Sequence, residues 1–238
     1  MITTFEVGGV SLDVIRKDIK NVHLSVYPPM GRVRISAPSR MSLDTIRLFA
    51  ISKLGWIKKQ QQKLQEQARE SQLEYLGRES HYLWGRRHLL KVIEVDSAPQ
   101  VAVQHNTLLL QVRPGWNIEK RQALLEDWRR QELRAAAAPL IEAWEPLLGV
   151  KVERIFLQRM KTKWGSSSPK SGGIRLNSEL ARKPRECLEY ILVHEMVHLL
   201  EPAHNHRFVA LMERFMPNWP HYRDLLNRLP VRHERWQY

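Results

Sequence analysis

The sequence contains a single cysteine, Cys187, among 238 residues. One thiol cannot form an intramolecular disulfide, and it is too few for a zinc cluster built from cysteines. Cysteine usage of this kind is typical of a reducing cytoplasm, which is where we expect the protein to be. Any metal that it binds must therefore be held by histidine or carboxylate side chains.

Long apolar runs are also missing. No segment approaches the roughly 20 consecutive apolar residues that a membrane-spanning helix requires. The N-terminus, MITTFEVGGVSLDVIRK, lacks a positive leader followed by an apolar stretch. These absences predict a soluble protein that is not exported. The composition gives no indication of disorder, and 238 residues suffice for one large globular domain or two small ones.

Acidic residues are few relative to basic ones. The 25 Asp and Glu stand against 38 Lys and Arg, so the formal net charge is +13 at pH 7. Such a charge favours contact with polyanions, because neutralised phosphates release counterions. No basic run is interleaved with the aromatic residues expected of a base-stacking platform. Nucleic acid or nucleoprotein is one candidate partner, and a well-solvated basic surface is the alternative.

The first 115 residues have a β-rich pattern interrupted by one long helix. Apolar and polar residues alternate over 5–38, and again over 81–114, which predicts one antiparallel sheet layer. Between these stretches, residues 42–70 have a helical spacing that begins at Ser42, a candidate N-cap, and becomes almost wholly polar. From residue 116 onward the sequence is mainly helical, so we predict two regions, 1–115 and 116–238, in an α+β fold.

Residues 194–206 contain four of the ten histidines. The preceding segment reads as a helix from about Pro184 to about Leu200, because Pro184 suits a first turn and Pro202 disfavours helical backbone before it. Apolar residues cover nearly its whole circumference, which predicts a buried helix. Burying imidazole or carboxylate groups in it costs several kcal/mol unless each finds a partner.

Metal coordination supplies that partner. His194 and His198 lie one helical turn apart and can reach a single ion, with Glu195 beside them, in the H-E-x-x-H arrangement. A zinc ion held by these imidazoles and a third protein ligand keeps a position open for water, whose pKa falls towards about 7. Glu195 can then take the proton of that water during attack on a carbonyl. The pattern predicts a zinc-dependent peptidase with one zinc ion per chain.

The third ligand must come from outside the helix. His204 lies six residues beyond His198, the interval found in the H-E-x-x-H-x-x-G-x-x-H zinc peptidases. The turn glycine of that pattern is replaced here by Glu201, so the path back to the metal must differ. His204 is our first choice, and His206 and then Glu213 are the alternatives.

Residues 159–219, from RMKTKWGSSSPKSGGIRLN through the H-E-x-x-H helix to MPNW, resemble the core of the YgjP-like metallopeptidases, which are zincin-like relatives of the SprT and WLM metalloproteases. The stretch APSRMSLDTIRLFAISKLGWIKKQ in the N-terminal half is also similar to this family. The resemblance implies a zincin-like metallopeptidase domain over 116–238, zinc ligands at His194, His198 and His204, and Glu195 as the catalytic base. Many relatives have a cysteine where this sequence has Ser167.

The segment before the helix has two interpretations. The strand expected at 173–177, GIRLN, could offer its edge to an extended peptide, with Trp164, Ser166 and Ser167 at its rim, or the tryptophan could simply be packed in the core. Asn177 is a guess for a residue that supports the metal ligands.

A second functional class remains open. The chain could be a nucleic-acid-binding protein with a structural or vestigial zinc site, although a water-activating Glu195 gives such a site no advantage. A peptidase recruited to nucleoprotein by basic residues is a third reading, with candidates Lys161, Lys163, Lys170 and Arg175.

Overall fold

The computed structural model describes residues 2–27, 31–66, 73–160 and 163–229. The fold is α+β, as predicted, and the described residues divide by their contacts into two units, one before residue 67 and one over 73–229. This division falls earlier in the chain than the boundary that we predicted at 115/116, which stays a prediction. No helix in the described ranges is long and apolar enough to cross a bilayer.

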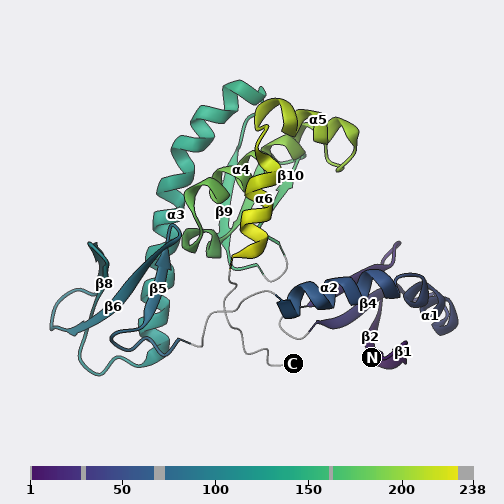
Figure 1. Ribbon diagram of the computed structural model, residues 1–238, viewed down its shortest axis with the longest axis horizontal. Helices are drawn as coiled ribbons and strands as arrows, with labels where there is room; N and C mark the ends of the chain where they lie inside the picture. Colours follow the sequence, from purple (N-terminus) through teal and green to yellow (C-terminus); the bar gives the residue numbers. More distant parts are fainter. Residues whose placement is uncertain (1, 28–30, 67–72, 161–162, 230–238) are drawn as a thin grey trace. The chain divides into compact units, whose positions relative to one another are not determined.

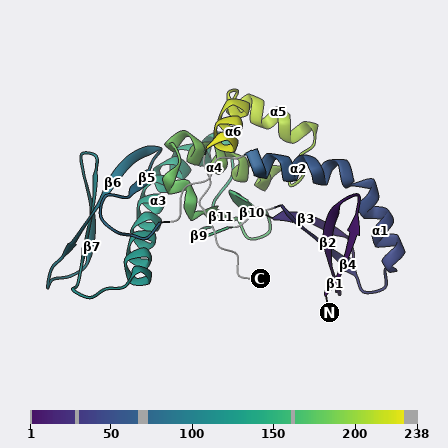
Figure 2. The same ribbon diagram turned by 60° about the horizontal axis from the view of Figure 1, so that its bottom comes forward.

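The N-terminal unit is a four-stranded sheet covered on one face by two helices (Figure 2). The strands have the order β1-β2-β4-β3, and β2 and β4 run parallel. The residues at 0 % exposure include Leu12, Val33 and Ile35, which alternate with polar positions as the sequence pattern predicts. The elements of this unit are β1 (Ile2–Val7), β2 (Val10–Lys17), β3 (His23–Tyr27), β4 (Arg32–Pro38), α1 (Leu43–Ser52) and α2 (Leu54–Glu66).

The single helix predicted over 42–70 is wrong, because two helices, α1 and α2, meet at Lys53. The hydroxyl of Ser52 donates a hydrogen bond to the carbonyl of Phe49 at 2.8 Å, and back-bonding of this kind bends helices. The predicted start is confirmed, since Ser42 accepts a hydrogen bond from the backbone N–H of Thr45. Residues 67–70 of the prediction lie outside the described residues.

The second unit begins with a sheet of its own, of order β5-β6-β8-β7. We expected these strands to complete the N-terminal sheet, and that was wrong: in the described ranges they pair only with one another. Their apolar face packs instead against the helix that follows, through Leu90, Leu108 and Leu125. His105 and Asn106 form the hairpin turn that joins the last two of these strands in the sequence. The strands are β5 (Ser80–Leu83), β6 (Arg86–Glu94), β7 (Gln100–Gln104) and β8 (Thr107–Val112).

A long helix, α3 (Ile118–Leu148), connects this sheet with the remainder of the unit (Figure 1). Asn117 caps its start by accepting a hydrogen bond from Lys120 N, and Gly149 ends it in the left-handed conformation. The helix contacts β7 and β8 near one end and the helix α4 (Arg185–Leu200) farther on. Both parts of the unit therefore pack against α3.

A three-stranded sheet and three helices complete the unit. The strand order is β10-β11-β9, so the strand predicted at 173–177 is central and cannot offer a free edge. The edge next to it is β10, which packs against α4. Apolar residues of α3, β11 and α4 form the largest core of the chain. The elements are β9 (Arg154–Gln158), β10 (Gly165–Ser168), β11 (Gly173–Asn177), the 3₁₀ turn η1 (Ser178–Arg182), α4, α5 (His206–Phe215) and α6 (Trp219–Arg228).

Candidate metal centre

Helix α4 is buried on most of its circumference, as its apolar composition predicts. It contacts β10, β11, α3, α5 and α6. The helix ends at Leu200, where Glu201 takes an extended conformation with φ −139° and ψ 99°. The polar side chains of its last two turns therefore lie at the edge of the largest core of the chain.

The chain then turns back without a glycine. The side chain of Glu201 accepts a hydrogen bond from the backbone N–H of Ala203 at 3.3 Å, and Asn205 caps the next helix by accepting one from Phe208 N at 3.0 Å. The extended residue at 201 replaces the left-handed turn that a glycine would allow. This route brings His204 against the end of α4.

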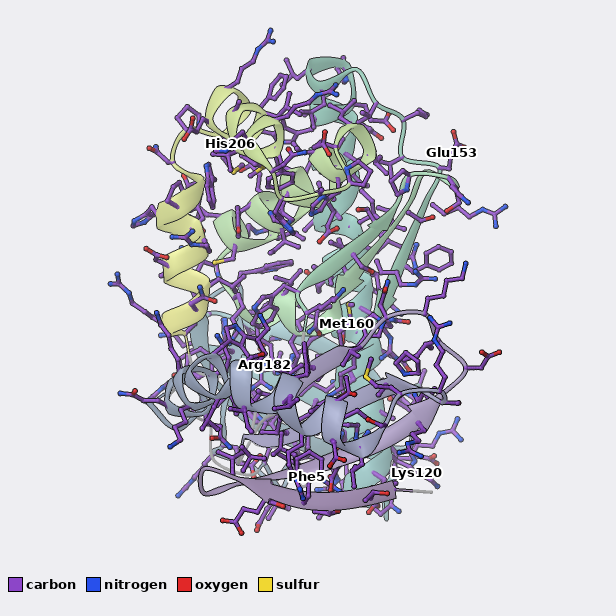
Figure 3. All side chains as sticks on the ribbon, turned by 90° about the vertical axis from the view of Figure 1, so that its right-hand side faces the viewer. Phe5, Lys120, Glu153, Met160, Arg182 and His206 are labelled. Carbon is purple, nitrogen blue, oxygen red and sulfur yellow. The ribbon has the colours of Figure 1, made fainter. Side chains whose placement is uncertain are left out.

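Three imidazole nitrogens converge at this point. His204 Nε2 lies 3.0 Å from His198 Nε2 and 3.1 Å from His194 Nε2. In the described part of the chain this is the one group of three or more His, Cys, Asp or Glu side chains that could hold a metal ion. His206, labelled in Figure 3, begins α5, and Glu213 is exposed on the same helix; neither belongs to the group.

The donor set fits a divalent cation of the zinc type. His198 Nδ1 donates a hydrogen bond to the carbonyl of Glu201 at 3.0 Å, which leaves the lone pair of its Nε2 directed at the other two rings. Nitrogen ligands of a tetrahedral zinc ion lie about 3.3 Å apart, from Zn–N distances of about 2.0–2.1 Å. The observed separations of 3.0 and 3.1 Å are close to that value.

Two of the three rings, His194 and His204, have lowered pKa values, which favours the neutral form that a metal needs. Desolvation, followed by the neighbouring His198 and His204, lowers the pKa of His194 to about 3. The pKa of His204 is also lowered, by burial and then by His198 and Lys163. Protons therefore compete weakly for these two imidazoles near neutral pH.

The ring of Phe208 contacts the rings of all three histidines. Its ring centroid lies 4.5 Å from that of His198, 4.7 Å from that of His204 and 4.9 Å from that of His194. The side chain is 2 % exposed, so its position is fixed by the core. A rigid aromatic surface under all three rings restricts their rotation and keeps the donor set in place.

Glu195 lies beside the cluster and is only 5 % exposed. Burial raises its pKa to about 7, while a side-chain hydrogen bond with Ser167 and the charge of Lys163 oppose that rise. The backbone of Gly165 is so close that a Cβ added there would stand 2.7 Å from Glu195 Oε1. Sequence reasoning did not anticipate either interaction, although Gly165 and Ser167 both lie in the WGSS segment at residues 164–167.

The other residues that the sequence singled out have structural contacts. The ring of Trp164 packs against the main core, and Lys183 Nζ lies 5.9 Å from its centroid, which favours the packed interpretation. In the described ranges, the hydrogen bonds of the Asn177 side chain join it to Met160, Lys163 and Glu179 and not to the candidate metal ligands. Its amide donates to the carbonyls of Met160 and Lys163, both at 2.9 Å, and so holds the loop that precedes β10 (Met160 is labelled in Figure 3).

Two solved structures are similar to parts of the chain. The metallopeptidase zymogen abylysin of Pyrococcus abyssi is 24 % identical, with a TM-score of 0.36 over 40 % of this chain and 98 % of its own. The metallopeptidase zymogen jannalysin of Methanocaldococcus jannaschii is 22 % identical, with a TM-score of 0.33 over 37 % of this chain and 91 % of its own. A comparison with proteins of curated function finds no match.

The family comparison covers far more of the sequence. The model of the YgjP-like metallopeptidase domain matches residues 20–229, which include α4, the return turn and β10. The match confirms the resemblance found in the sequence, and a metallopeptidase is by its chemistry a metal-dependent hydrolase of proteins or peptides. The chain belongs to the YgjP-like metallopeptidase family.

Proposed function

We propose that this protein is a zinc-dependent peptidase in which His194, His198 and His204 hold the metal and Glu195 is the general base. The observation that carries the proposal is the convergence of three Nε2 atoms beside a buried carboxylate. Zinc is the metal that three neutral imidazoles suit best among the common catalytic ions. A bound zinc ion would supply Lewis acidity towards a peptide carbonyl and a nearby water.

Glu195 performs the proton transfers. Its carboxylate takes a proton from the attacking water as the new C–O bond forms, and it delivers that proton to the amine nitrogen as the C–N bond breaks. A pKa of about 7 suits both steps, because the group accepts and releases a proton with similar ease near neutral pH. Its burial beside the histidines also excludes bulk water from the proton path.

The substrate has a place to bind beside Glu195. Among the described strands β10 pairs only with β11, so its other edge offers unpaired backbone groups. An extended peptide can add to such an edge as another strand. Gly165 at the start of β10 touches Glu195, so a peptide along this strand would pass next to the carboxylate.

Metal analysis of three proteins tests the ligand set. We expect about one zinc per chain in the wild type and in His206→Ala, and loss of zinc in His204→Ala. His206 is the matched control because it is an exposed histidine two residues from His204. Zinc retained in His204→Ala and lost in His206→Ala would show that the third ligand is assigned to the wrong residue.

The role of Glu195 needs a separate measurement. Glu195→Gln preserves the shape of the side chain but cannot accept the proton, so it should keep zinc and lose peptide hydrolysis by about 100-fold or more. Turnover equal to that of the wild type in a zinc-loaded Glu195→Gln protein would remove the mechanism.

Location and a polyanionic partner are further proposals. The buried single thiol of Cys187 supports a cytoplasmic location. The net charge of +13 supports recruitment to nucleic acid. Lys163, Lys170 and Arg175 lie in the described part of the chain, whereas Lys161 lies outside it. DNA affinity that falls steeply with added salt and persists in Glu195→Gln would support recruitment, and affinity that does not change with salt would contradict it.

A further inference from the structure

The three-stranded sheet of β9, β10 and β11 has one covered face and one face that is open to solvent. Helix α4 contacts β10 and β11, and Ile174 and Leu176 of β11 are fully buried in the core that α4 shares. Side chains of a strand alternate between its two faces, so Arg175 lies on the other side of the sheet. On β9, Phe156 lies on that side as well. Both side chains are exposed.

Strand pairing arranges the residues of this open face in two rows. From β10 through β11 to β9, the rows are Ser166, Arg175 and Phe156, and then Ser168, Gly173 and Arg154. The guanidinium Cζ of Arg175 lies 5.4 Å from the centroid of the Phe156 ring. A Cβ added to Gly173 would stand 3.6 Å from Cε2 of the same ring, so the ring lies beside bare backbone. The open face therefore presents an aromatic ring together with a positively charged group.

The charge of the open face has one sign. The three strands, RIFLQ, GSSS and GIRLN, contain two arginines and no acidic residue. Neither Arg154 nor Arg175 forms an ion pair with another described residue. Glu153, labelled in Figure 3, precedes β9, and a Cβ on Gly172 would stand 2.7 Å from its Cγ, which places it at the end of the sheet and outside the two rows. The open face therefore suits an anionic partner.

An exposed apolar side chain is common on protein surfaces and does not by itself indicate a partner. Phe156 is unusual because it is 44 % exposed, and among the Phe, Trp and Tyr side chains of the described ranges only Trp56 is also exposed. The sequence has no basic run with interleaved aromatic residues, but the pairing of β9 with β11 brings Arg175 beside this ring. Aromatic rings and guanidinium planes are the surfaces on which unpaired bases stack, and a sheet face can present them.

We propose that the open face binds single-stranded nucleic acid, with a base stacked on Phe156 and phosphate groups bound by Arg154 and Arg175. This names the surface for the polyanionic partner proposed above, so it rests on that recruitment but not on the peptidase activity. Bases in a duplex are stacked on one another, so the ring is available only to an unpaired base. Gly165 approaches Glu195 from the opposite face of the sheet, so a strand bound here leaves the metal centre clear.

Two substitutions of the same residue test base stacking. Phe156→Leu keeps an apolar side chain but removes the ring, whereas Phe156→Tyr keeps the ring. Fluorescence anisotropy gives the Kd of the zinc-loaded full chain for a labelled mixed-sequence DNA strand of about 12 nucleotides. We expect Phe156→Leu to raise this Kd by about 5- to 100-fold, and Phe156→Tyr to change it by less than about 2-fold. Leu89→Ala is the matched control, because Leu89 also lies on a strand and is also 44 % exposed.

The salt dependence of the same binding tests the two arginines. Each phosphate contact with a single strand contributes about −0.7 to the slope of log K against log salt. Arg154→Gln and Arg175→Gln should each make the slope shallower by about 0.7. Arg134→Gln removes an exposed arginine from α3 and should leave the slope unchanged. The duplex of the same sequence should bind equally to the wild type and to Phe156→Leu.

The outcomes that would overturn the proposal are distinct. Equal Kd values for the wild type and Phe156→Leu would show that the strand binds elsewhere, and the recruitment proposed above would then stand without this surface. A wild type that binds no strand would remove both. A wild type that is dimeric by light scattering and a Phe156→Leu variant that is monomeric would show instead that the open face joins two copies of the chain.

Discussion

The tightest contact at the site makes Gly165→Ala the most informative substitution. Gly165 is buried and its φ lies outside the left-handed region, so alanine can adopt the backbone without strain. The methyl group of alanine, however, has no room at this position. The added methyl group would stand 2.7 Å from Cγ and Oε1 of Glu195 and 3.0 Å from its Cδ. Ordinary contacts between such atoms are about 3.5–4.0 Å, so the carboxylate must move by about 1 Å.

That displacement sets the expected size of the effect. A misplacement of about 1 Å in a reacting group can cost about 100-fold in rate. Overpacking of a buried position costs about 1–3 kcal/mol of stability, which the fold should survive. We therefore expect Gly165→Ala to bind zinc, to unfold at a somewhat lower temperature, and to lose about 100-fold in kcat.

The assay compares kcat, zinc content and thermal unfolding in Gly165→Ala with those in Gly77→Ala, a position where an added Cβ meets nothing within 4 Å. Gly77→Ala should have the activity of the wild type. A Gly165→Ala protein that keeps both zinc and wild-type kcat would refute the geometry, because it would show that the carboxylate either does not lie against β10 or is not needed there.

Three further predictions concern removal of the metal, the thiol of Cys187 and the hydrogen bonds of Asn177. When free zinc is at about 1,000 times its Kd, removing the metal with a chelator should lower the free energy of unfolding by about 4 kcal/mol. Calorimetry should then show a Tm that is lower by about 8–16 °C. The His204→Ala variant should show no such shift. Cys187 has 0 % exposure, and burial raises the pKa of its thiol to about 11. Iodoacetamide at pH 8 should therefore label this thiol only after the protein is unfolded in urea. Rapid labelling of the folded protein would contradict the burial of Cys187. Asn177→Ala removes the side-chain hydrogen bonds with Met160, Lys163 and Glu179. At about 1 kcal/mol for each bond, the free energy of unfolding measured by urea titration should fall by about 2–5 kcal/mol. A fall of less than about 1 kcal/mol would show that Asn177 does not anchor this part of the chain.

Local sequence rules were sufficient to predict helix α4. The period of apolar residues and the two prolines predicted α4 within one residue at its start, because both signals depend on neighbours in the sequence. The interval of six residues between His198 and His204 favoured the residue that the structure places in the cluster. The sequence could not show how the turn at Glu201 is made without glycine, because the extended backbone there is held by contacts with Ala203 and Val197.

Local sequence patterns did not predict the order of the strands. Alternation identifies strands but not their partners, so the two four-stranded sheets were taken as one layer, and β11 was taken as an edge. Pairing depends on which helix covers each apolar face: α1 and α2 cover the first sheet, whereas Leu125 of α3 packs on the second. The close approach of Gly165 to Glu195 was missed for the same reason, because these two residues lie 30 positions apart in the sequence.

The polar groups of α4 are only partly satisfied by the protein itself, and this imbalance favours a bound cation. His198 has a partner for Nδ1 in the carbonyl of Glu201. His194 has a buried Nδ1 without a hydrogen-bond partner in the described structure, and its Nε2 faces other imidazoles. Three neutral rings that direct Nε2 atoms at one another cannot all be donors and acceptors in balance. A cation would accept every lone pair at once, so a bound cation would offset the desolvation of these rings.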